Sequence, residues 1–155
     1  MISLRSLAVS AAVVAMAGAA IADSHQTNPA IKARQALMEL YGHNNYYLLN
    51  MSRGRIDYNA ESAQAAADSL SALMQVSQMR MWAPGTDAES SAGTRASPDI
   101  WANFPDVFAK AGAVVVAVGE LQQVAGDGAD ALAPAIAKVN GACNACHKDY
   151  RLPEG

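Results

Sequence analysis

Apolar residues recur every three or four positions along most of the chain, and almost no stretch alternates between apolar and polar residues. This spacing places apolar side chains on one face of a helix, whereas a half-buried strand requires strict alternation. Four segments carry the helical spacing, at about residues 28–51, 59–79, 97–118 and 130–150. The pattern therefore predicts an all-α protein with four long helices.

Two of these segments contain residues that start or interrupt helices. Asn59 is suited to cap the second segment. Ser97, Pro98 and Asp99 together form a strong start for the third. Pro105 lies seven positions after Pro98, where a proline removes a backbone hydrogen bond and clashes with the preceding turn. We therefore expect a kink or a restart of the third helix at Pro105.

The connections between the segments determine how the helices pack. The links at 54–59 and 126–129 are short, so the helices that they join must be antiparallel neighbours. Residues 82–97 form a longer, turn-rich loop, which also permits this arrangement. The simplest fold is an up-down-up-down antiparallel four-helix bundle.

The first 22 residues have the features of a secretory signal peptide. Arg5 precedes an apolar run from Leu7 to Ala17, and Ala20-Ile21-Ala22 has the small-x-small pattern of a cleavage site. The run is shorter than the roughly 20 residues that span a bilayer, and no later stretch is as apolar. We therefore predict export to the periplasm, no membrane span and a single mature domain over residues 23–155.

The charge of the chain excludes one class of partner. The formal net charge is −3, and loss of the predicted leader removes Arg5 and makes the charge more negative. Nucleic-acid binding requires a basic patch that neutralises phosphates, and the few cations here are scattered along the sequence. We therefore expect no nucleic-acid partner. A net acidic carrier would instead be steered toward a basic face of a partner protein.

The strongest chemical motif is Cys143-Asn144-Ala145-Cys146-His147, the C-x-x-C-H pattern that attaches a c-type haem. Three positions apart on a helix, both thiols project from one face and can form thioethers with the two vinyl groups of one porphyrin. The adjacent His147 brings an imidazole to the iron. We therefore predict one covalently attached haem c, with Cys143 and Cys146 binding the porphyrin and His147 binding the iron.

Three other uses of Cys143 and Cys146 compete with haem attachment. A thioredoxin-like pair requires a helix N-terminus to stabilise the thiolate, whereas this pair lies near the end of the last helix. A zinc site requires three or four ligands, and His25 and His43 are distant in the sequence. A disulfide between residues so close on one helix would strain that helix. Haem attachment is the best interpretation, and it also consumes thiols that an exported protein would otherwise oxidise.

Four short stretches besides the haem motif match a known family: Ala33-Arg34-Gln35-Ala36-Leu37-Met38, Pro84-Gly85-Thr86, Pro98-Asp99-Ile100-Trp101 and Tyr150-Arg151. Over essentially all of the predicted mature domain the chain resembles the class II c-type cytochromes, which comprise the cytochrome c′ family and its low-spin relatives. The resemblance implies a four-helix bundle with the haem near its C-terminus. It also implies a basic residue, here Arg151, beside the histidine ligand. Finally, it implies homodimers through the first helix, where Tyr46, Tyr47 and Met51 offer a face.

Function depends on the sixth coordination position of the iron, since a filled position makes an electron carrier and an open one binds small gases. The candidate ligands in the mature chain are Met38, Met51, Met74, Met79, Met81, His25 and His43. In the predicted bundle, the end of the fourth helix lies beside the start of the first helix. Met38 is then at the level of His147, and Met51 is at the far end. Met74, at the end of the second helix, is the main rival.

The neighbours of Met38 on its helix support this choice. Gly42, one turn later, removes a side chain where a porphyrin would press. Arg34, one turn earlier, is placed to turn its guanidinium toward a haem propionate. In the low-spin proteins that the chain resembles, a methionine at this motif position is the axial ligand. In cytochrome c′ proper, the matching position holds a side chain that does not bind iron.

The sequence therefore predicts a periplasmic monohaem cytochrome that transfers single electrons, with its iron held between His147 and Met38. The first alternative is an open-site cytochrome c′ that binds nitric oxide or carbon monoxide. The second alternative is a helical bundle without haem and with a redox-active Cys143–Cys146 pair. No nucleophile with an adjacent base is evident, so we do not predict an enzyme. The identity of the redox partner protein is not specified by the sequence.

Overall fold

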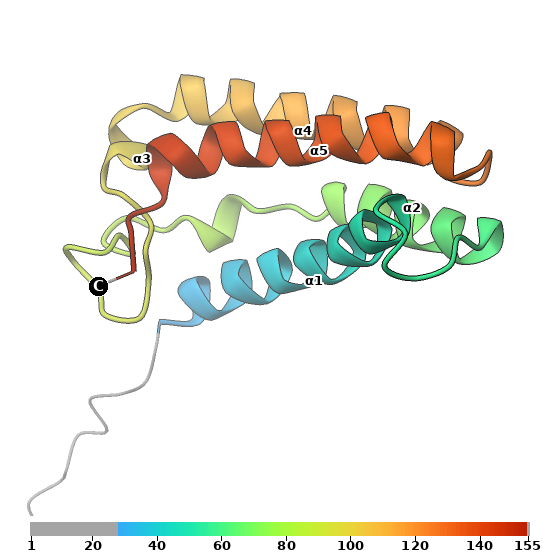
Figure 1. Ribbon diagram of the computed structural model, residues 1–155. Coiled ribbons are helices and arrows are strands. Elements are labelled where there is room, and N and C mark those ends of the chain that lie inside the picture. The colour runs from blue at the N-terminus through green and yellow to red at the C-terminus, as the bar shows by residue number, and fades with distance from the viewer. Residues whose placement is uncertain (1–27, 155) are drawn as a thin grey trace, which may run out of the picture.

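The computed structural model describes residues 28–154, which fold into an antiparallel bundle of four long helices (Figure 1). The elements are α1 (Pro29–Ser52), α2 (Ala60–Met74), the 3₁₀ turn η1 (Met79–Met81), α3 (Asp99–Ala102), α4 (Phe104–Val124) and α5 (Ala129–Tyr150). Helix α1 packs against α2 and α5, and α4 packs against the same two helices. The predicted all-α, up-down-up-down bundle is confirmed.

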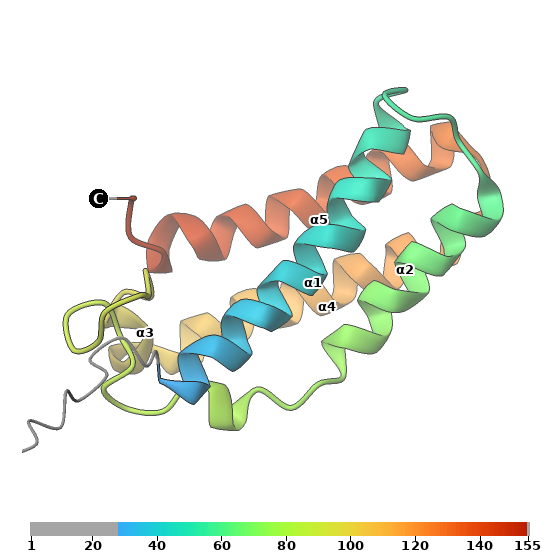
Figure 2. The same ribbon diagram turned by 90° about the horizontal axis from the view of Figure 1, so that it is seen from below.

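The two ends of the bundle differ in construction (Figures 1 and 2). One end, called the turn end below, carries the α1–α2 and α4–α5 connections. The other, called the loop end, carries α3, the end of α5 and the long loop over residues 75–98, which contains η1. In both views α1 and α5 lie close together toward the turn end and diverge toward the loop end.

Polar side chains and glycines define where the helices begin and turn. The Asn28 side chain accepts a hydrogen bond at 2.9 Å from the backbone N–H two residues further on. Asn59 accepts one at 2.8 Å from the N–H three residues further on, which confirms its predicted capping role. Gly54 and Gly128, in the two short turns, have positive φ values of 65° and 119°, a region that favours glycine.

Two predicted helices have different limits in the structure. The third is divided, as Pro105 predicts: α3 ends at Ala102, and α4 begins two residues later with Pro105 in its first turn, where it costs no hydrogen bond. The second is shorter than predicted, because it ends at Met74 rather than at residue 79. In its last turn the Leu73 carbonyl accepts hydrogen bonds from the Val76 N–H at 3.2 Å and from the Tyr41 hydroxyl of α1 at 3.1 Å.

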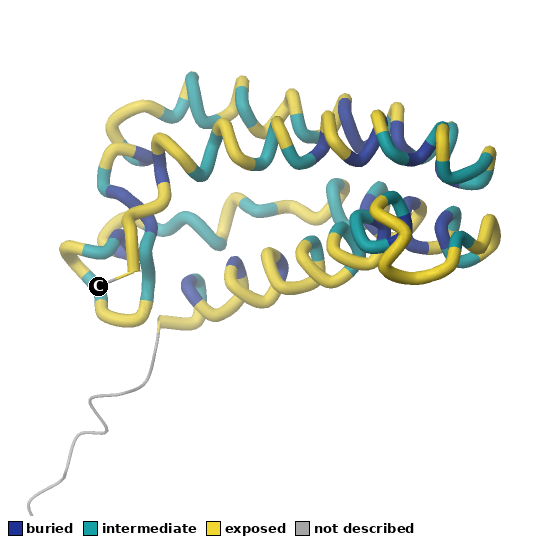
Figure 3. Tube along the Cα trace, in the orientation of Figure 1, coloured by how far each residue is buried: buried dark blue, intermediate teal, exposed yellow. Residues whose placement is uncertain are grey.

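Most of the buried apolar side chains form one cluster toward the turn end. This larger cluster contains Leu48, Met51, Ala63, Ala66, Ala67, Leu70, Ala117, Val118, Leu121, Ala125, Leu132, Ala135, Ile136 and Val139. Six of its members are alanines, which allow the helices to approach closely. Figure 3 shows that, apart from its last residue, the buried positions of α5 lie in its half toward the turn end.

A smaller cluster at the loop end joins α5 to α3 and the long loop. Its buried members are Ala96, Ile100 and Tyr150, and Trp82, Trp101, Phe104, Val107 and Cys146 pack against them. The Ser97 N–H donates a hydrogen bond to the Tyr150 carbonyl at 3.0 Å, and the Leu152 N–H donates one to the Arg95 carbonyl at 2.8 Å. The long loop is therefore fastened to the end of α5 and to the residues that follow it.

A buried arginine fastens the same loop to α1. Arg34 is only 3% exposed. Its guanidinium donates hydrogen bonds to the Met81 carbonyl, to both the hydroxyl and the carbonyl of Thr86, and to the Thr94 hydroxyl. The guanidinium carbon also lies 5.0 Å from the centre of the Trp82 ring. These contacts compensate the buried cation for its lost hydration and hold the loop against α1.

A polar network joins α4 to the end of α5. Asp106 accepts hydrogen bonds from the Lys110 ammonium and from the Tyr150 hydroxyl, the latter at 2.6 Å. Lys110 also pairs with Asp149 at 3.3 Å. The hydrogen bonds from Lys110 and Tyr150 hold the pKa of the Asp106 carboxyl below its ordinary value. Sequence analysis missed this network, although the i,i+4 spacing of Asp106 and Lys110 is a signal for an ion pair on a helix.

None of the helices between residues 28 and 154 is both long enough and apolar enough to cross a bilayer. The predicted signal peptide over residues 1–22 lies outside the described residues, as does the candidate ligand His25. The leader and the limits of the mature domain therefore stay predictions from the sequence.

The larger cluster predicts different costs for truncating two leucines of α1. Leu48 is 0% exposed, whereas Leu40 is 50% exposed. We expect Leu48→Ala to lower the free energy of unfolding by about 2–5 kcal/mol, because it removes buried methyl groups and leaves a cavity. The matched change Leu40→Ala should cost less than about 1 kcal/mol. Urea unfolding of the haem-loaded protein, followed by circular dichroism, measures both, and equal costs would contradict the assigned core.

The polar network predicts a pH-dependent contribution from Asp106. Its pKa is lower in the folded state than the value of about 3.9 in an unfolded chain. The resulting stabilisation is complete above that pH and is lost as the pH falls through the folded-state value. We therefore expect Asp106→Asn to lower the melting temperature at pH 7, and the difference from wild type to shrink as the pH falls below about 3.9 and through the lowered folded-state pKa.

Melting curves recorded between pH 7 and the acid limit test this expectation. Asp57→Asn, in the exposed α1–α2 turn, is the matched control and should leave the melting temperature nearly unchanged throughout. An Asp106→Asn difference that persists undiminished in acid would show that its cause is not the charge of the carboxylate.

Candidate haem-binding site

The last two turns of α5 carry the predicted attachment motif. Cys143 and Cys146 are both free and half-buried. Cys143 packs against the larger cluster, whereas Cys146 packs against the smaller one. The face of α5 that carries the two thiols therefore runs between the two clusters, and His147 follows directly on the same turn.

The surroundings of the two thiols discriminate between the possible uses of the cysteine pair. Burial raises the pKa of Cys143 and of Cys146 above the ordinary value. Such thiols are protonated and weakly nucleophilic at neutral pH, unlike a thioredoxin-like pair, whose thiolate must be stabilised. Within residues 28–154, no group of three or more His, Cys, Asp and Glu side chains is arranged to hold a metal ion. These observations weigh against the redox pair and against the zinc site.

His147 is partly buried and has cationic neighbours. Burial, together with the charges of Arg151 and Arg95, lowers its pKa below the ordinary value. The neutral imidazole is the form that binds a metal, and these surroundings favour it. The histidine also lines an open cleft of about 370 Å³, together with Arg95, Asn144, Lys148, Arg151 and Pro153.

Between the two clusters the helices contribute half-buried or exposed side chains. Among the described residues, none is fully buried in 38–47 of α1, 104–116 of α4 or 140–149 of α5. Ten residues of helix extend over about 15 Å, which is the scale of a porphyrin. The chain's own side chains therefore do not complete a packed core at the level of the haem motif.

Apolar groups are available at this level to cover a large flat cofactor. Met38 is 39% exposed, although Arg34, one turn earlier on the same side of α1, is buried. Phe108 is 60% exposed and stacks on Phe104 with 5.7 Å between ring centroids. A Cβ added to Gly42 would meet no atom within 4 Å, so this position leaves room beside α1. The donor set and these surroundings fit a covalently attached haem.

The candidates for the sixth position have different surroundings. Met51 is buried in the larger cluster, and Met74 packs against that cluster. His43 is exposed, and Met79 is 76% exposed in η1. Met38 belongs to neither cluster and lies in the loop-end half of α1, the half that adjoins the haem motif on α5. Met79 and Met81 of η1 also belong to neither cluster, but η1 packs against α1, whereas α1 packs against α5.

The predicted contact between Arg34 and a haem propionate stays a prediction. The four hydrogen bonds of its guanidinium go to residues 81–94 of the long loop. Trp82, beneath the guanidinium, meets Trp101 edge to face with 6.1 Å between ring centroids. The Trp101 ring N–H donates a hydrogen bond to the Trp82 carbonyl at 3.1 Å. Sequence analysis missed this role of Arg34, because a turn-rich loop has no period that reveals which helix it contacts.

Comparison with known proteins places these features in a family. The sequence profile described as cytochrome c′ matches residues 29–151. The cytochrome c-554 of Cereibacter sphaeroides is 32% identical over 145 residues, which cover 94% of each chain. The solved structure of cytochrome c′ from Rhodobacter sphaeroides has a TM-score of 0.79 at 34% identity, and the match covers 81% of this chain and 96% of that one.

A similar solved structure shows a ligand complex. The nitric oxide complex of a leucine-to-alanine variant of cytochrome c prime from Alcaligenes xylosoxidans has a TM-score of 0.70 at 28% identity. That match covers 81% of this chain and 94% of the other. The profile match extends from the start of α1 to the end of α5 and includes the cysteines of the haem motif. The chain therefore belongs to the cytochrome c′ family and carries one covalently attached haem c.

Proposed function

We propose that this protein is a periplasmic monohaem cytochrome that transfers single electrons, with its iron bound between His147 and Met38. The observation that carries the proposal is the environment of the Met38 thioether. It lies outside both hydrophobic clusters in the half of α1 that adjoins the haem motif, whereas Met51 and Met74 are engaged by the larger cluster. Met79 and Met81 also lie outside both clusters, but they belong to η1, whereas Met38 lies on α1, which packs against the helix that carries the haem motif.

Helix α5 supplies the other attachments in this proposal. Cys143 and Cys146 hold the porphyrin at two points on one helix face, between the two clusters. An uncharged thioether suits these half-buried, apolar surroundings, whereas a thiolate would lose hydration there. His147 follows directly, and its lowered pKa keeps the imidazole in the form that binds iron.

When bound, the haem supplies a one-electron couple at its iron. A thioether ligand such as Met38 favours the reduced state and so raises the reduction potential. The larger cluster and the Trp82–Trp101 pair place apolar side chains on either side of the space between the clusters. Restricted access of solvent tunes the potential and limits reorganisation when the charge of the site changes.

A second candidate function is the binding of nitric oxide or carbon monoxide at an open sixth position. The comparisons favour it, because the matching profile is that of cytochrome c′ and a similar solved structure is a nitric oxide complex. Met38 would then be a side chain near the iron that does not bind it. The two candidates differ in whether the Met38 sulfur binds the iron, and neither requires catalytic residues.

Export and assembly complete the proposal. The periplasmic location rests on the sequence features of residues 1–22. A redox partner protein is required for electron transfer. A homodimer through α1 stays a prediction, and Tyr46 and Tyr47, which are 61% and 38% exposed, are available for it. Met51, the third residue expected on that face, is 3% exposed and belongs to the larger cluster, so it is not available.

Covalent attachment predicts a simple extraction result. We expect the protein, co-expressed with a cytochrome c maturation system, to retain its pigment in acid acetone, because two thioethers hold the porphyrin. Cys143→Ala combined with Cys146→Ala should lose it completely. Cys143→Ala alone should keep one thioether, which shifts the pyridine haemochrome band to longer wavelength. Release of the wild-type pigment would refute the attachment.

Ligation by Met38 predicts a change of spin state on mutation. We expect the wild-type ferric protein to be low-spin, with the weak long-wavelength band of methionine-ligated haem, and the ferrous protein to react slowly with carbon monoxide. Met38→Ala should give a high-spin protein that binds carbon monoxide readily, because the sixth position opens. Absorption spectra and carbon monoxide titration measure both effects.

Met74→Ala is the matched control for this experiment, and it should leave the spectrum unchanged because Met74 packs against the larger cluster. A wild-type spectrum that is already high-spin would support the gas-binding candidate instead. A low-spin spectrum that survives Met38→Ala would keep the electron-carrier function and assign the sixth ligand to another residue.

A further inference from the structure

The cleft that His147 lines is basic, although the chain as a whole is acidic. Its lining contains Arg95, Lys148 and Arg151 and no acidic residue. The whole chain, by contrast, has a formal net charge of −3. Cations therefore gather at the place where the proposed iron ligand reaches an open surface.

Acidic side chains near the cleft compensate these cations only in part. Glu154 pairs with Arg95 at 2.6 Å, but the Glu154 side chain is 85% exposed, so water weakens the interaction. Asp149 pairs with Lys110 of α4 at 3.3 Å. Among the described residues, neither Lys148 nor Arg151 forms an ion pair. At least two positive charges therefore remain available beside His147.

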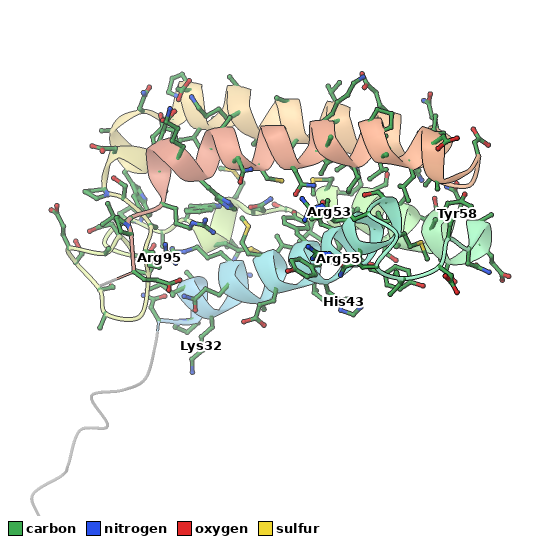
Figure 4. All side chains as sticks on the ribbon, in the orientation of Figure 1. Lys32, His43, Arg53, Arg55, Tyr58 and Arg95 are labelled. Atoms are coloured by element: carbon green, nitrogen blue, oxygen red, sulfur yellow. The ribbon has the colours of Figure 1, made fainter. Side chains whose placement is uncertain are left out.

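The rim of the cleft is also held in place. The Arg95 side-chain Nε donates a hydrogen bond to the Leu152 carbonyl at 2.7 Å, and its backbone carbonyl accepts one from the Leu152 N–H. Figure 4 shows Arg95 at the loop end, beside the C-terminal segment that follows α5. A preorganised rim costs a partner little ordering when it binds.

Local charge outweighs net charge at the distance of a docking partner. The Debye length is about 10 Å at 0.1 M salt, whereas the 24 residues of α1 extend over about 36 Å from the loop end to the turn end. Acidic residues of the turn end, such as Asp57, Glu61 and Asp127, therefore lie several Debye lengths from the cleft. A partner that approaches His147 meets a positive surface.

We propose that electrons enter and leave through this cleft, and that it docks the acidic face of a redox partner protein. The inference rests on the proposed electron-carrier function. It reverses the expectation from net charge, which favoured a partner with a basic face. His147 would connect the cleft to the iron, because that side chain is both the proposed ligand and part of the lining.

Small redox ions test the direction of electrostatic steering. Hexacyanoferrate(III) is an anion and tris(phenanthroline)cobalt(III) is a cation, and both oxidise ferrous cytochromes. Between about 0.05 and 0.3 M salt, we expect the stopped-flow rate with the anion to fall as salt rises and the rate with the cation to increase. The opposite dependence, which the net charge predicts, would overturn the proposal.

Charge substitutions locate the effect on the surface. Lys148→Glu should lower the ratio of the anion rate to the cation rate about three- to tenfold or more at low salt, and Lys148→Gln should lower it by a smaller factor. The ratio cancels any change in reduction potential, because both reagents react with the same haem. Lys32→Glu makes the same charge change on α1, where Lys32 points away from the body of the molecule (Figure 4). Equal effects of Lys148→Glu and Lys32→Glu would show that only net charge matters.

An acidic redox protein tests docking itself. We expect electron transfer from reduced flavodoxin, a protein with an acidic surface, to slow in Lys148→Glu and to be unaffected by Lys32→Glu. A response to hexacyanoferrate(III) without a response to flavodoxin would make the cleft an entrance for small ions and would overturn the docking proposal. The spectrum of Met38→Ala decides the proposed function separately, because it reports the sixth ligand and not the site of electron entry.

Discussion

Two hydrophobic clusters that do not meet are the constraint on which the rest of this structure depends. The larger cluster is sufficient for the turn end, but the face of α5 that carries the cysteines runs on between the clusters without burying a side chain fully. Burial of apolar surface contributes about 25 cal/mol per Å², so an attached haem would add to the core as well as carry the redox chemistry. The loop end is held meanwhile by polar contacts, through Arg34 on one side and Asp106 with Tyr150 on the other.

How far the fold and the site follow from the sequence depends on the range of the interactions involved. Helical spacing and the restart at Pro105 are local, and both were predicted. The C-x-x-C-H motif is also local, so it identified the cofactor without a structure. At the early end of α2, the Leu73 carbonyl accepts a hydrogen bond from the Tyr41 hydroxyl of another helix, and no pattern within α2 predicts this contact. The hydrogen bonds of Arg34 join residues that are 47 to 60 positions apart in the sequence, so no local pattern predicts them either.

The place where the cations gather also depends on contacts between residues that are distant in the sequence. Lys148 and Arg151 lie close to His147 in the sequence, whereas Arg95 comes from the long loop and joins them only because its backbone pairs with Leu152. Net charge is a sum over positions and carries no information on where the cations gather. The lining of the cleft is therefore basic in a chain whose net charge is negative, and screening by salt gives nearby charges more weight than distant ones.

The bundle is narrower at the turn end than at the loop end, so residues far from the haem motif help to position the helices around it. Alanines such as Ala63 and Ala67 bring the helices together at the turn end, while Trp82, Trp101 and Phe104 fill the wider loop end. Ala63 and Ala67 belong to α2, so at this narrow end they determine how closely α2 approaches its neighbours, which include α1. A bulkier side chain at one of these alanines would push α1 away from α2 and so shift the position of Met38 relative to α5. On either proposed function, the properties of the iron would then change through a substitution that never touches the cofactor.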